Sequence, residues 1–261
     1  MGAADLSTQG PMARRIRDVA TALDVVVGPS PSDLRSMPAP VSPWRTALES
    51  PSKPKRVLWL PTIEGFGPDQ EIGSVCRSAV EQIAESGVEV VESGPILSGA
   101  LGPFIQLFFG GMLTVYGPMM GTKAWHDVTP GLAAMLEMSP GLITIDSMEK
   151  GRVEAQALSV LLAKSMEGFD ALISPTVAGQ TPISMEEGVV NGEVTEAWVS
   201  YTYPFNVTRR PASTTCAGFT DDGMPVGLQV VGHQLADARV LEITAWVEDL
   251  LGLDPVAPSL E

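Results

Sequence analysis

Side chains able to carry covalent catalysis are few in this chain and lie far apart in the sequence. It contains two histidines, His126 and His233, so a hydroxyl or thiol activated by histidine must use one of them. His126 precedes Asp127 and could form half of a Ser-His-Asp triad, but no Gly-x-Ser-x-Gly elbow occurs. Cys216 could be a nucleophile if His233 folds beside it. The alternative is that Cys216 is a small buried hydrophobe in a strand.

A second pattern, from Ser147 to Lys150, has the spacing Ser-x-x-Lys. On a helix this spacing places both side chains on one face, where the amine could deprotonate the hydroxyl. The Ser-Asp-Asn and Lys-Thr-Gly motifs that accompany such a pair are absent from the sequence. The competing interpretation is therefore an exposed pair of helix residues.

The sequence offers no ligand pattern for a metal ion or cofactor. Its two cysteines, Cys76 and Cys216, are far apart, and neither CxxC nor Cys/His ligand spacing occurs. No carboxylate run resembles a calcium loop. The segment GFGPDQ, residues 65–70, begins like a dinucleotide fingerprint but lacks its third glycine. We therefore expect no metal and no cofactor.

Composition and charge exclude several classes of protein. The 261 residues are 44% hydrophobic, which is enough for a substantial core. The formal net charge of −15 argues against a nucleic-acid-binding surface, which needs clustered positive charge. The start MGAADLSTQG lacks the basic and apolar regions of a signal peptide, so we expect a cytoplasmic protein.

One stretch, residues 93–122, contains no charged side chain. Its length could span a bilayer, but Pro95, Pro103 and Pro118 interrupt it and glycine recurs throughout. We expect it to form core or an apolar pocket wall, and a membrane contact is the less favoured alternative.

Periodicity and turn residues predict an α/β protein. We expect helices over 11–27, 69–86, 147–167 and 236–251, further helices within 101–167, and strands over 57–60, 88–92, 171–174, 213–217 and 227–231. The strand–helix–strand order over 57–92 predicts parallel pairing. Residues 29–56 are rich in Pro and Ser and predict an irregular surface connection with a short turn near 44–48.

Several motifs together resemble the carboxy-terminal part of the amidase signature family. Residues 203–232, YPFNVTRRPASTTCAGFTDDGMPVGLQVVG, carry Pro-Phe-Asn, Pro-Ala, Gly-Phe-Thr and Asp-Gly-x-Pro-x-Gly-Leu-Gln in the family's order. FDALISPTVAGQTPI, residues 169–183, is similar to the family's strand and its Ser/Thr-Pro-Thr turn. GPMARRIRDVATALDVVVG, residues 10–28, is similar to its Gly-Pro-Met-x-Arg helix. Two departures are Arg209, where Gly is usual, and Gly-His-Gln at 232–234, where Gly-Arg-Pro is frequent.

The resemblance implies an incomplete α/β domain with a mixed β-sheet flanked by helices, lacking the amino-terminal catalytic core. Residues 1–28 would hold the helix that follows that core, 29–167 the variable region, and 168–261 the carboxy-terminal strands and helix. Members of the family hydrolyse amides with a nucleophilic serine, a bridging serine in a cis peptide and a lysine base. These lie in a Gly/Ser-rich region before the Gly-Pro-Met helix. No such run occurs in this sequence, and its first lysine is Lys53.

The resemblance thus implies part of an amidase that is inactive alone. The segment that remains is expected to supply a sheet edge, outer helices and a substrate-pocket wall that includes Thr176, Asn206, Cys216 and Phe109. The ligand would be a small-molecule amide, bound once the missing half is supplied. Because a cut sheet exposes edges, we expect a partner chain or self-association. The alternatives are a non-catalytic binding or scaffold protein derived from an amidase, and a decayed remnant without function.

Overall fold

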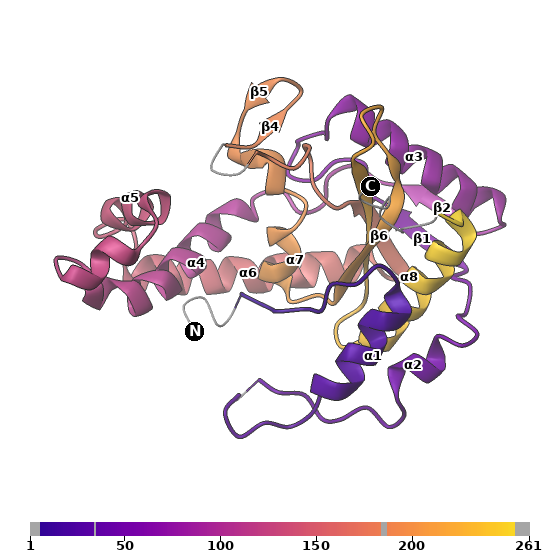
Figure 1. Ribbon diagram of the computed structural model, residues 1–261, viewed down its shortest axis with the longest axis horizontal. Coiled ribbons are helices and arrows are strands. Elements are labelled where there is room, and N and C mark those ends of the chain that lie inside the picture. The colour runs from indigo at the N-terminus through magenta and orange to yellow at the C-terminus, as the bar shows by residue number, and fades with distance from the viewer. Residues whose placement is uncertain (1–5, 34, 184–186, 254–261) are drawn as a thin grey trace, which may run out of the picture.

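A five-stranded mixed β-sheet with helices on both faces organises the protein (Figure 1). The computed structural model describes residues 6–33, 35–183 and 187–253. The strand order is β2-β1-β3-β7-β6. The strands are β1 (Arg56–Trp59), β2 (Glu89–Glu92), β3 (Ala171–Pro175), β6 (Ala212–Phe219) and β7 (Pro225–Val231). β2 and β3 run parallel to β1, whereas β7 is antiparallel to both β3 and β6.

The first half of the sheet is the βαβ unit that the sequence predicts. β1 is joined to β2 by α3 (Gln70–Glu85), and the two strands pair in parallel register. Three of the four β1 residues are buried, which explains why the sequence of this strand is an uninterrupted apolar run after Arg56. Asp69 precedes α3 as expected, but its carboxylate accepts a hydrogen bond from the backbone of Asn191 and makes no side-chain cap to the helix.

Alternating side chains of the strands build two cores, one on each face of the sheet. Val57, Ile173 and Val230 point toward α3 and the last helix, α8 (Asp237–Leu251). Leu172 and Val231 point toward the other face. That face is covered by the carboxy-terminal part of α6 (Ile145–Ser165) and by α7 (Tyr203–Thr208).

An arm of helices extends from the sheet at the left of Figure 1. We use the name arm for α4, η1, η2, α5 and the first turns of α6. The bounds are α4 (Leu101–Tyr116), η1 (Gly117–Met119), η2 (Lys123–Asp127) and α5 (Pro130–Met138). α4 packs along α6 and holds most of the uncharged stretch. No helix among the described residues has both the length and the apolar character needed to cross a membrane.

The first helix, α1 (Ile16–Val26), begins five residues later than the sequence predicts. The reason is a contact from the other end of the chain: the carboxylate of Glu248 accepts the backbone N–H of Ile16 at 3.0 Å. This bond satisfies a free donor of the first turn without a local capping side chain. Ile16 and Ala20 pack against Leu241 of α8 and Leu48, which follows the short helix α2 (Trp44–Ala47).

Further elements depart from the sequence-based expectation. α7, the hairpin of β4 (Val189–Val190) and β5 (Glu193–Val194), and η3 (Glu196–Val199) were not expected. They are too short for periodicity to mark them. α6 begins at Ile145, two residues earlier than expected. The turn between β6 and β7 is as predicted, with Gly223 at φ 86°, a conformation that favours glycine.

Asp170 ties the beginnings of β3 and β1 together. Its Oδ2 accepts the backbone N–H groups of Lys55 at 2.6 Å and Arg56 at 3.0 Å. Burial alone would raise the pKa of this carboxyl, but these two bonds and the charges of Arg239 and Lys55 leave it below the ordinary value of 3.8. A carboxyl with a depressed folded pKa stabilises the fold above its unfolded pKa, and loses that contribution as the pH falls through the folded pKa.

We therefore predict that Asp170→Asn lowers the free energy of unfolding by about 1 kcal/mol at pH 7, since an amide keeps an acceptor but loses the charge-assisted bonds. Urea unfolding measured from pH 7 downward should show this deficit shrinking below pH 4, near the ordinary pKa of the group. Asp127→Asn, which changes an exposed carboxylate on the arm, is the control. An undiminished deficit at pH 3 would contradict the assignment.

Candidate functional site

A set of polar side chains crosses the sheet on the face that α7 covers. We call it the polar strip, and it consists of Ser174, Thr176, Thr214, Cys216 and Gln229. The strand register brings them together, because Gln229 lies opposite both Ser174 and Thr214 in neighbouring strands, and Cys216 lies opposite Gly227. Since side chains alternate between faces, all five belong to the face that also holds Leu172 and Val231.

The inner end of the polar strip is buried and hydrogen-bonded. Gln229 is 5% exposed, and its Nε2 donates to Ser174 Oγ at 3.1 Å and to the carbonyl oxygen of Tyr201 at 2.9 Å. Ser174 donates in turn to the carbonyl of Pro175. The Tyr201 hydroxyl donates to the carbonyl of Pro61 at 2.7 Å, and burial raises the pKa of this phenol. These bonds fasten the segment before α7 to the sheet.

The outer end of the polar strip is open. Thr176 Oγ1 and Thr214 Oγ1 lie 3.2 Å apart, beside Gly227. A Cβ at Gly227 would lie 2.7 Å from Thr176 Oγ1 and 2.8 Å from Thr214 Cγ2, so glycine is what allows the two threonines to approach. Thr214 is exposed and Cys216 is half-buried. The strip thus presents hydroxyl groups and a thiol on an uncovered part of the sheet.

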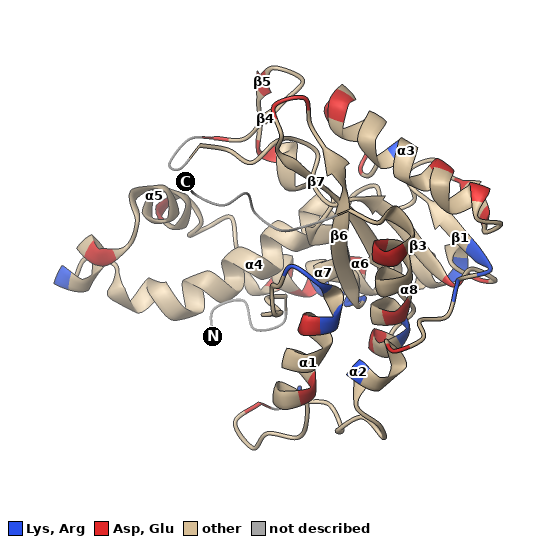
Figure 2. Ribbon diagram, turned by 45° about the vertical axis from the view of Figure 1, so that its right-hand side comes forward, with Lys and Arg blue, Asp and Glu red and all other residues tan. Residues whose placement is uncertain are grey.

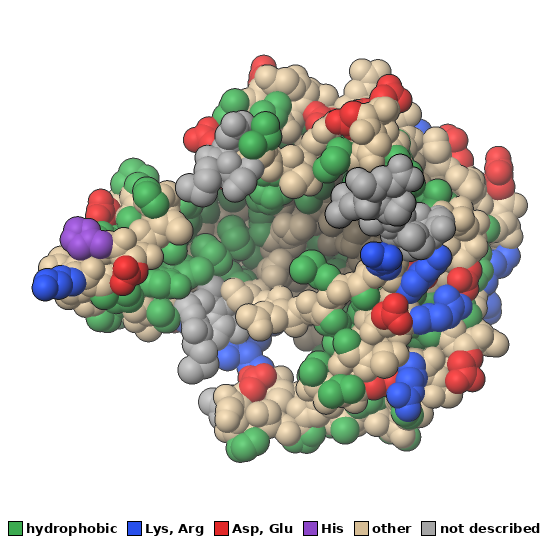
Figure 3. Space-filling model, in the orientation of Figure 1, with side chains coloured by type: hydrophobic (Ala, Val, Ile, Leu, Met, Phe, Trp, Pro, Cys, Tyr) green, Lys and Arg blue, Asp and Glu red, His purple; other side chains and the backbone are tan. Residues whose placement is uncertain are grey.

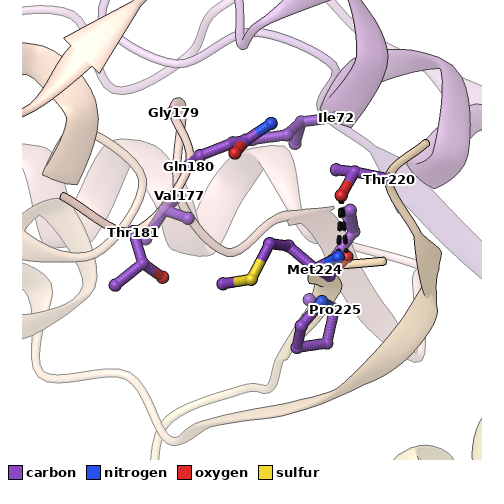
Figure 4. Close-up of a pocket in the computed structure, with 10 residues that line it drawn as sticks. Ile72, Val177, Gly179, Gln180, Thr181, Thr220, Met224 and Pro225 are labelled. Carbon is purple, nitrogen blue, oxygen red and sulfur yellow. Dashed lines mark hydrogen bonds between the residues drawn. The ribbon is translucent and has the colours of Figure 1, made fainter. Parts of the chain in front are cut away.

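A small cavity lies next to this end, under the β6–β7 turn (Figure 4). Its volume of about 40 Å³ is enough for a few water molecules and too small for a drug-sized ligand. Figure 4 shows Ile72 of α3, the segment from Val177 to Thr181, and Met224 with Pro225 around it. Within the turn, Thr220 Oγ1 accepts the backbone N–H of Met224 at 2.9 Å.

The four residues assigned to a pocket wall from the sequence fall into two groups. Thr176 and Cys216 both lie beside Gly227 at the outer end of the polar strip. Asn206 lies in α7, where its Nδ2 donates to the carbonyl of Leu6 at 2.8 Å. Phe109 lies in α4 and makes an edge-to-face contact with Phe108, with ring centroids 5.5 Å apart.

The pairing of Cys216 with His233 is wrong. Cys216 lies opposite Gly227, and His233 follows the far end of β7, six residues further along. At 3.4 Å per residue in an antiparallel strand, this places them roughly 20 Å apart. His233 Nε2 is instead 2.8 Å from the carbonyl oxygen of Phe169, and the Cys216 thiol is 3.3 Å from the carbonyl oxygen of Gly218. The other histidine, His126, is exposed in η2 on the arm.

The Ser-x-x-Lys pattern has a structural role at the start of α6. Ser147 and Thr144 form a reciprocal capping box, and the Ser147 hydroxyl donates to the carbonyl of Thr144 at 3.0 Å. Lys150 Nζ lies 3.7 Å from a carboxylate oxygen of Glu154 on the next turn. The hypothesis of an activated serine at this position is therefore not supported, and the structure contains a half-buried capping serine and an exposed lysine.

Sequence reasoning did not identify Gln229, Tyr201 or Thr214 as parts of a site. For Gln229 a signal existed: it is the one amide in the otherwise apolar run PVGLQVV, and a buried amide requires partners. Those partners come from β3 and from the segment before α7, so their identity depends on the fold. Among the described residues no group of three His, Cys, Asp or Glu side chains could hold a metal ion.

Comparisons with known proteins give one consistent result. The family model described as Amidase matches residues 2–107 and 137–241. An acylamidase of Rhodococcus erythropolis is 30% identical over 248 residues, covering 90% of this chain and 50% of that protein. A solved structure of 6-aminohexanoate cyclic dimer hydrolase with substrate superposes with a TM-score of 0.76 at 26% identity, covering 92% of this chain and 54% of that one.

A third match shows the fold alone. It is a structure described as a vestigial protein complex that reveals the evolutionary origins of an s-triazine catabolic enzyme. Its TM-score is 0.80 at 18% identity, and the match covers 95% of this chain and 54% of that one. The chain thus spans about half the length of the proteins it matches.

We predict that Gln229→Leu lowers the free energy of unfolding by about 1–3 kcal/mol, because the Tyr201 carbonyl loses its buried donor. Urea unfolding of the variant and the parent chain measures this difference. Gln234→Leu, at an exposed position after β7, is the matched control. Equal stability of the Gln229 variant and the parent would show that the polar strip does not hold this segment in place.

Proposed function

The chain belongs to the amidase family, and from that premise we propose that it forms the carboxy-terminal part of an amidase that hydrolyses a carboxamide to a carboxylic acid and ammonia or an amine. The observation that carries this proposal is the extent of the match: about nine-tenths of this chain corresponds to about half of an acylamidase. The folded unit therefore accounts for one half of such an enzyme.

The chemistry of amide hydrolysis supports assigning the reactive groups to the other half. The reaction needs a nucleophile, a base beside it and donors for the developing oxyanion. The polar strip holds hydroxyls and a thiol, but the described residues place no lysine or histidine in contact with them. Lys150 and His233, which the sequence offered as bases, have other contacts. We propose that a Ser–Ser–Lys triad from a Gly/Ser-rich segment outside these residues performs the reaction.

This half would contribute the wall of the substrate cavity. Figure 3 shows a hollow between the arm and the body of the sheet, with apolar and uncharged side chains in view inside it. We propose that Thr176 and Cys216 line this cavity from the sheet, and that Asn206 and Phe109 line it from the helices. The uncharged α4 would then receive the apolar acyl group of a small-molecule amide.

We predict that the purified chain does not hydrolyse aryl or aliphatic amides, since residues 6–33, 35–183 and 187–253 hold no pair of side chains placed to generate a nucleophile. A chimera in which it replaces the matched half of the R. erythropolis acylamidase should hydrolyse amides, as release of ammonia or amine will show. Turnover by the isolated chain that is lost in Ser147→Ala or Cys216→Ala would overturn the proposal. So would a chimera that folds cooperatively and has no activity, which would favour a non-catalytic binding protein.

In the active chimera, Phe109→Ala should raise the KM for an amide with a long acyl chain severalfold, because it removes aromatic surface from the proposed wall. The KM for an acetamide should change little. Phe66→Ala, which removes a half-exposed ring after β1, is the control. Equal changes in KM for the two substrates, or the same effect in the control, would show that Phe109 is not part of the cavity wall.

A further inference from the structure

A tight turn after β1 places a glutamate in a backbone conformation that suits glycine or asparagine. The N–H of Phe66 donates to the carbonyl of Ile63 at 2.9 Å, and the two residues between them, Glu64 and Gly65, have φ of 58° and 81°. Two positive φ values in succession are typical of a type I′ turn, whose central positions favour Asn, Asp and Gly. A glutamate at the first of these positions is uncommon, which directs attention to what its side chain contacts.

The side chain of Glu64 caps the first helix of the arm. Its Oε1 accepts the backbone N–H groups of Ala100 and of Leu101, the latter at 3.2 Å, and its Oε2 accepts that of Gly99 at 3.3 Å. N–H groups at the beginning of a helix lack intrahelical partners, and the helix macrodipole favours a negative charge there. One half-buried carboxylate thus satisfies three donors in a segment that begins 35 residues further along the chain.

α4 has no cap within its own sequence. The side chain of Ala100, at the capping position, makes no hydrogen bond, and the first turn holds no acidic residue. The whole helix lacks Lys, Arg, Asp and Glu, as its tan ribbon in Figure 2 shows. The negative charge at the beginning of α4 therefore comes from Glu64, on a different element of the fold.

The turn that carries Glu64 is itself fixed to the body of the protein. Ile63 is 1% exposed and belongs to the same core as Tyr201. The Tyr201 hydroxyl lies 2.7 Å from the carbonyl oxygen of Pro61 and 3.2 Å from that of Phe66, on the two sides of the turn. Glu64 thus joins a buried part of the body to the base of the arm.

The capped turn of α4 leads to a stack of aromatic rings. Phe104 stacks on Tyr203 of α7 with ring centroids 5.0 Å apart, and on Phe108 at 5.2 Å. Burial and then the charge of Glu64 raise the pKa of Tyr203 to about 12, because the carboxylate lies near the phenol. The position of the first turn of α4 therefore sets the position of Phe104, and of Phe109 further along the same helix.

We infer that Glu64 is a positioning residue for the wall of the substrate cavity: by capping α4 from the turn after β1, it fixes the width of the hollow and with it the selectivity for long acyl chains. This inference rests on the proposed function, in which α4 receives the acyl group. Asparagine or glycine would suit the turn better, but neither has a side chain long enough to reach α4. The strained glutamate is explained by the helix that it holds, and not by the turn in which it lies.

Three substitutions separate the capping of α4 from the conformation of the turn. Glu64→Gln keeps the length of the side chain and an acceptor oxygen but loses the charge. Glu64→Asn and Glu64→Gly suit a left-handed backbone and remove the contact with α4. Leu235→Gly is the matched control, because Leu235 also has a positive φ, 64°, and its side chain is 67% exposed.

Amide hydrogen exchange in the isolated chain reports on the cap directly. We expect exchange at Ala100 and Leu101 to be roughly tenfold faster in Glu64→Asn and Glu64→Gly than in the parent, with Glu64→Gln in between and Leu235→Gly unchanged. Circular dichroism melts confirm that each variant is folded. In the active chimera with the R. erythropolis acylamidase, Glu64→Asn and Glu64→Gly should raise the KM for a long-chain amide severalfold, whereas kcat and the KM for acetamide should change little.

The other outcomes decide between the claims. Exchange at Ala100 and Leu101 that is as slow in Glu64→Asn and Glu64→Gly as in the parent would overturn the inference, because α4 would then be held without this carboxylate. Faster exchange with equal changes in KM for the two amides would also overturn it and leave the proposed function standing. A parent chimera without activity would contradict the proposed function and with it the role of Glu64 in acyl binding, whereas the exchange rates would still show whether Glu64 holds α4.

Discussion

The need to satisfy the backbone of β6 is the constraint on which the rest of this structure depends. The backbone N–H and C=O groups of a strand point to both of its sides, and each needs a partner from a neighbouring strand or from solvent. β7 meets this need along one side of β6 through Ser213 and Thr215, because the bond from the Gly232 N–H to the Pro211 carbonyl sets which pairs of the ladder are hydrogen-bonded. Along the other side nothing in the described chain does so. At the opposite edge of the sheet, the glutamates of β2 form ion pairs with arginines, so that this edge strand is charged.

The two faces of the sheet show the same asymmetry. The face under α3 and α8 is a closed core, and its helices are joined to the beginning of the chain by the bond between Glu248 and the Ile16 N–H. The other face is closed where α6 and α7 lie on β1, β3 and β7, and open at β6. Gly227, Thr176 and Thr214 mark the boundary, where a buried network of amide and hydroxyl groups ends in exposed hydroxyls. The molecule thus has one face that the described helices close and one face that is open at β6.

Local chemistry made much of this fold predictable. The apolar runs of β1 and β3 and the amphipathic pattern of α3 are local signals, and they located the βαβ unit correctly. The start of α1 was missed because its cap, Glu248, is 232 residues away in the chain. The six residues of α7 were missed because Pro204 and the β-branched Val207 and Thr208 do not resemble a helix interior.

The candidate site was harder to predict because it depends on register. The positions of Thr176 and Cys216 beside Gly227 follow from the register of the paired strands, which could not be predicted from the sequence. The same register separates Cys216 from His233, which spacing alone left open. Ser147 shows a related ambiguity: a serine three residues before a lysine suits catalysis, but a serine three residues after Thr144 suits a helix cap, and the cap is what forms.

Amide hydrogen exchange along β6 tests the central claim most directly. The account predicts slow exchange at Ser213 and Thr215 in the isolated monomeric chain and fast exchange at Thr214 and Cys216. All four amides should exchange slowly once the other half of an amidase is bound. Slow exchange of Thr214 and Cys216 in the isolated monomer, or fast exchange in the active complex, would contradict it.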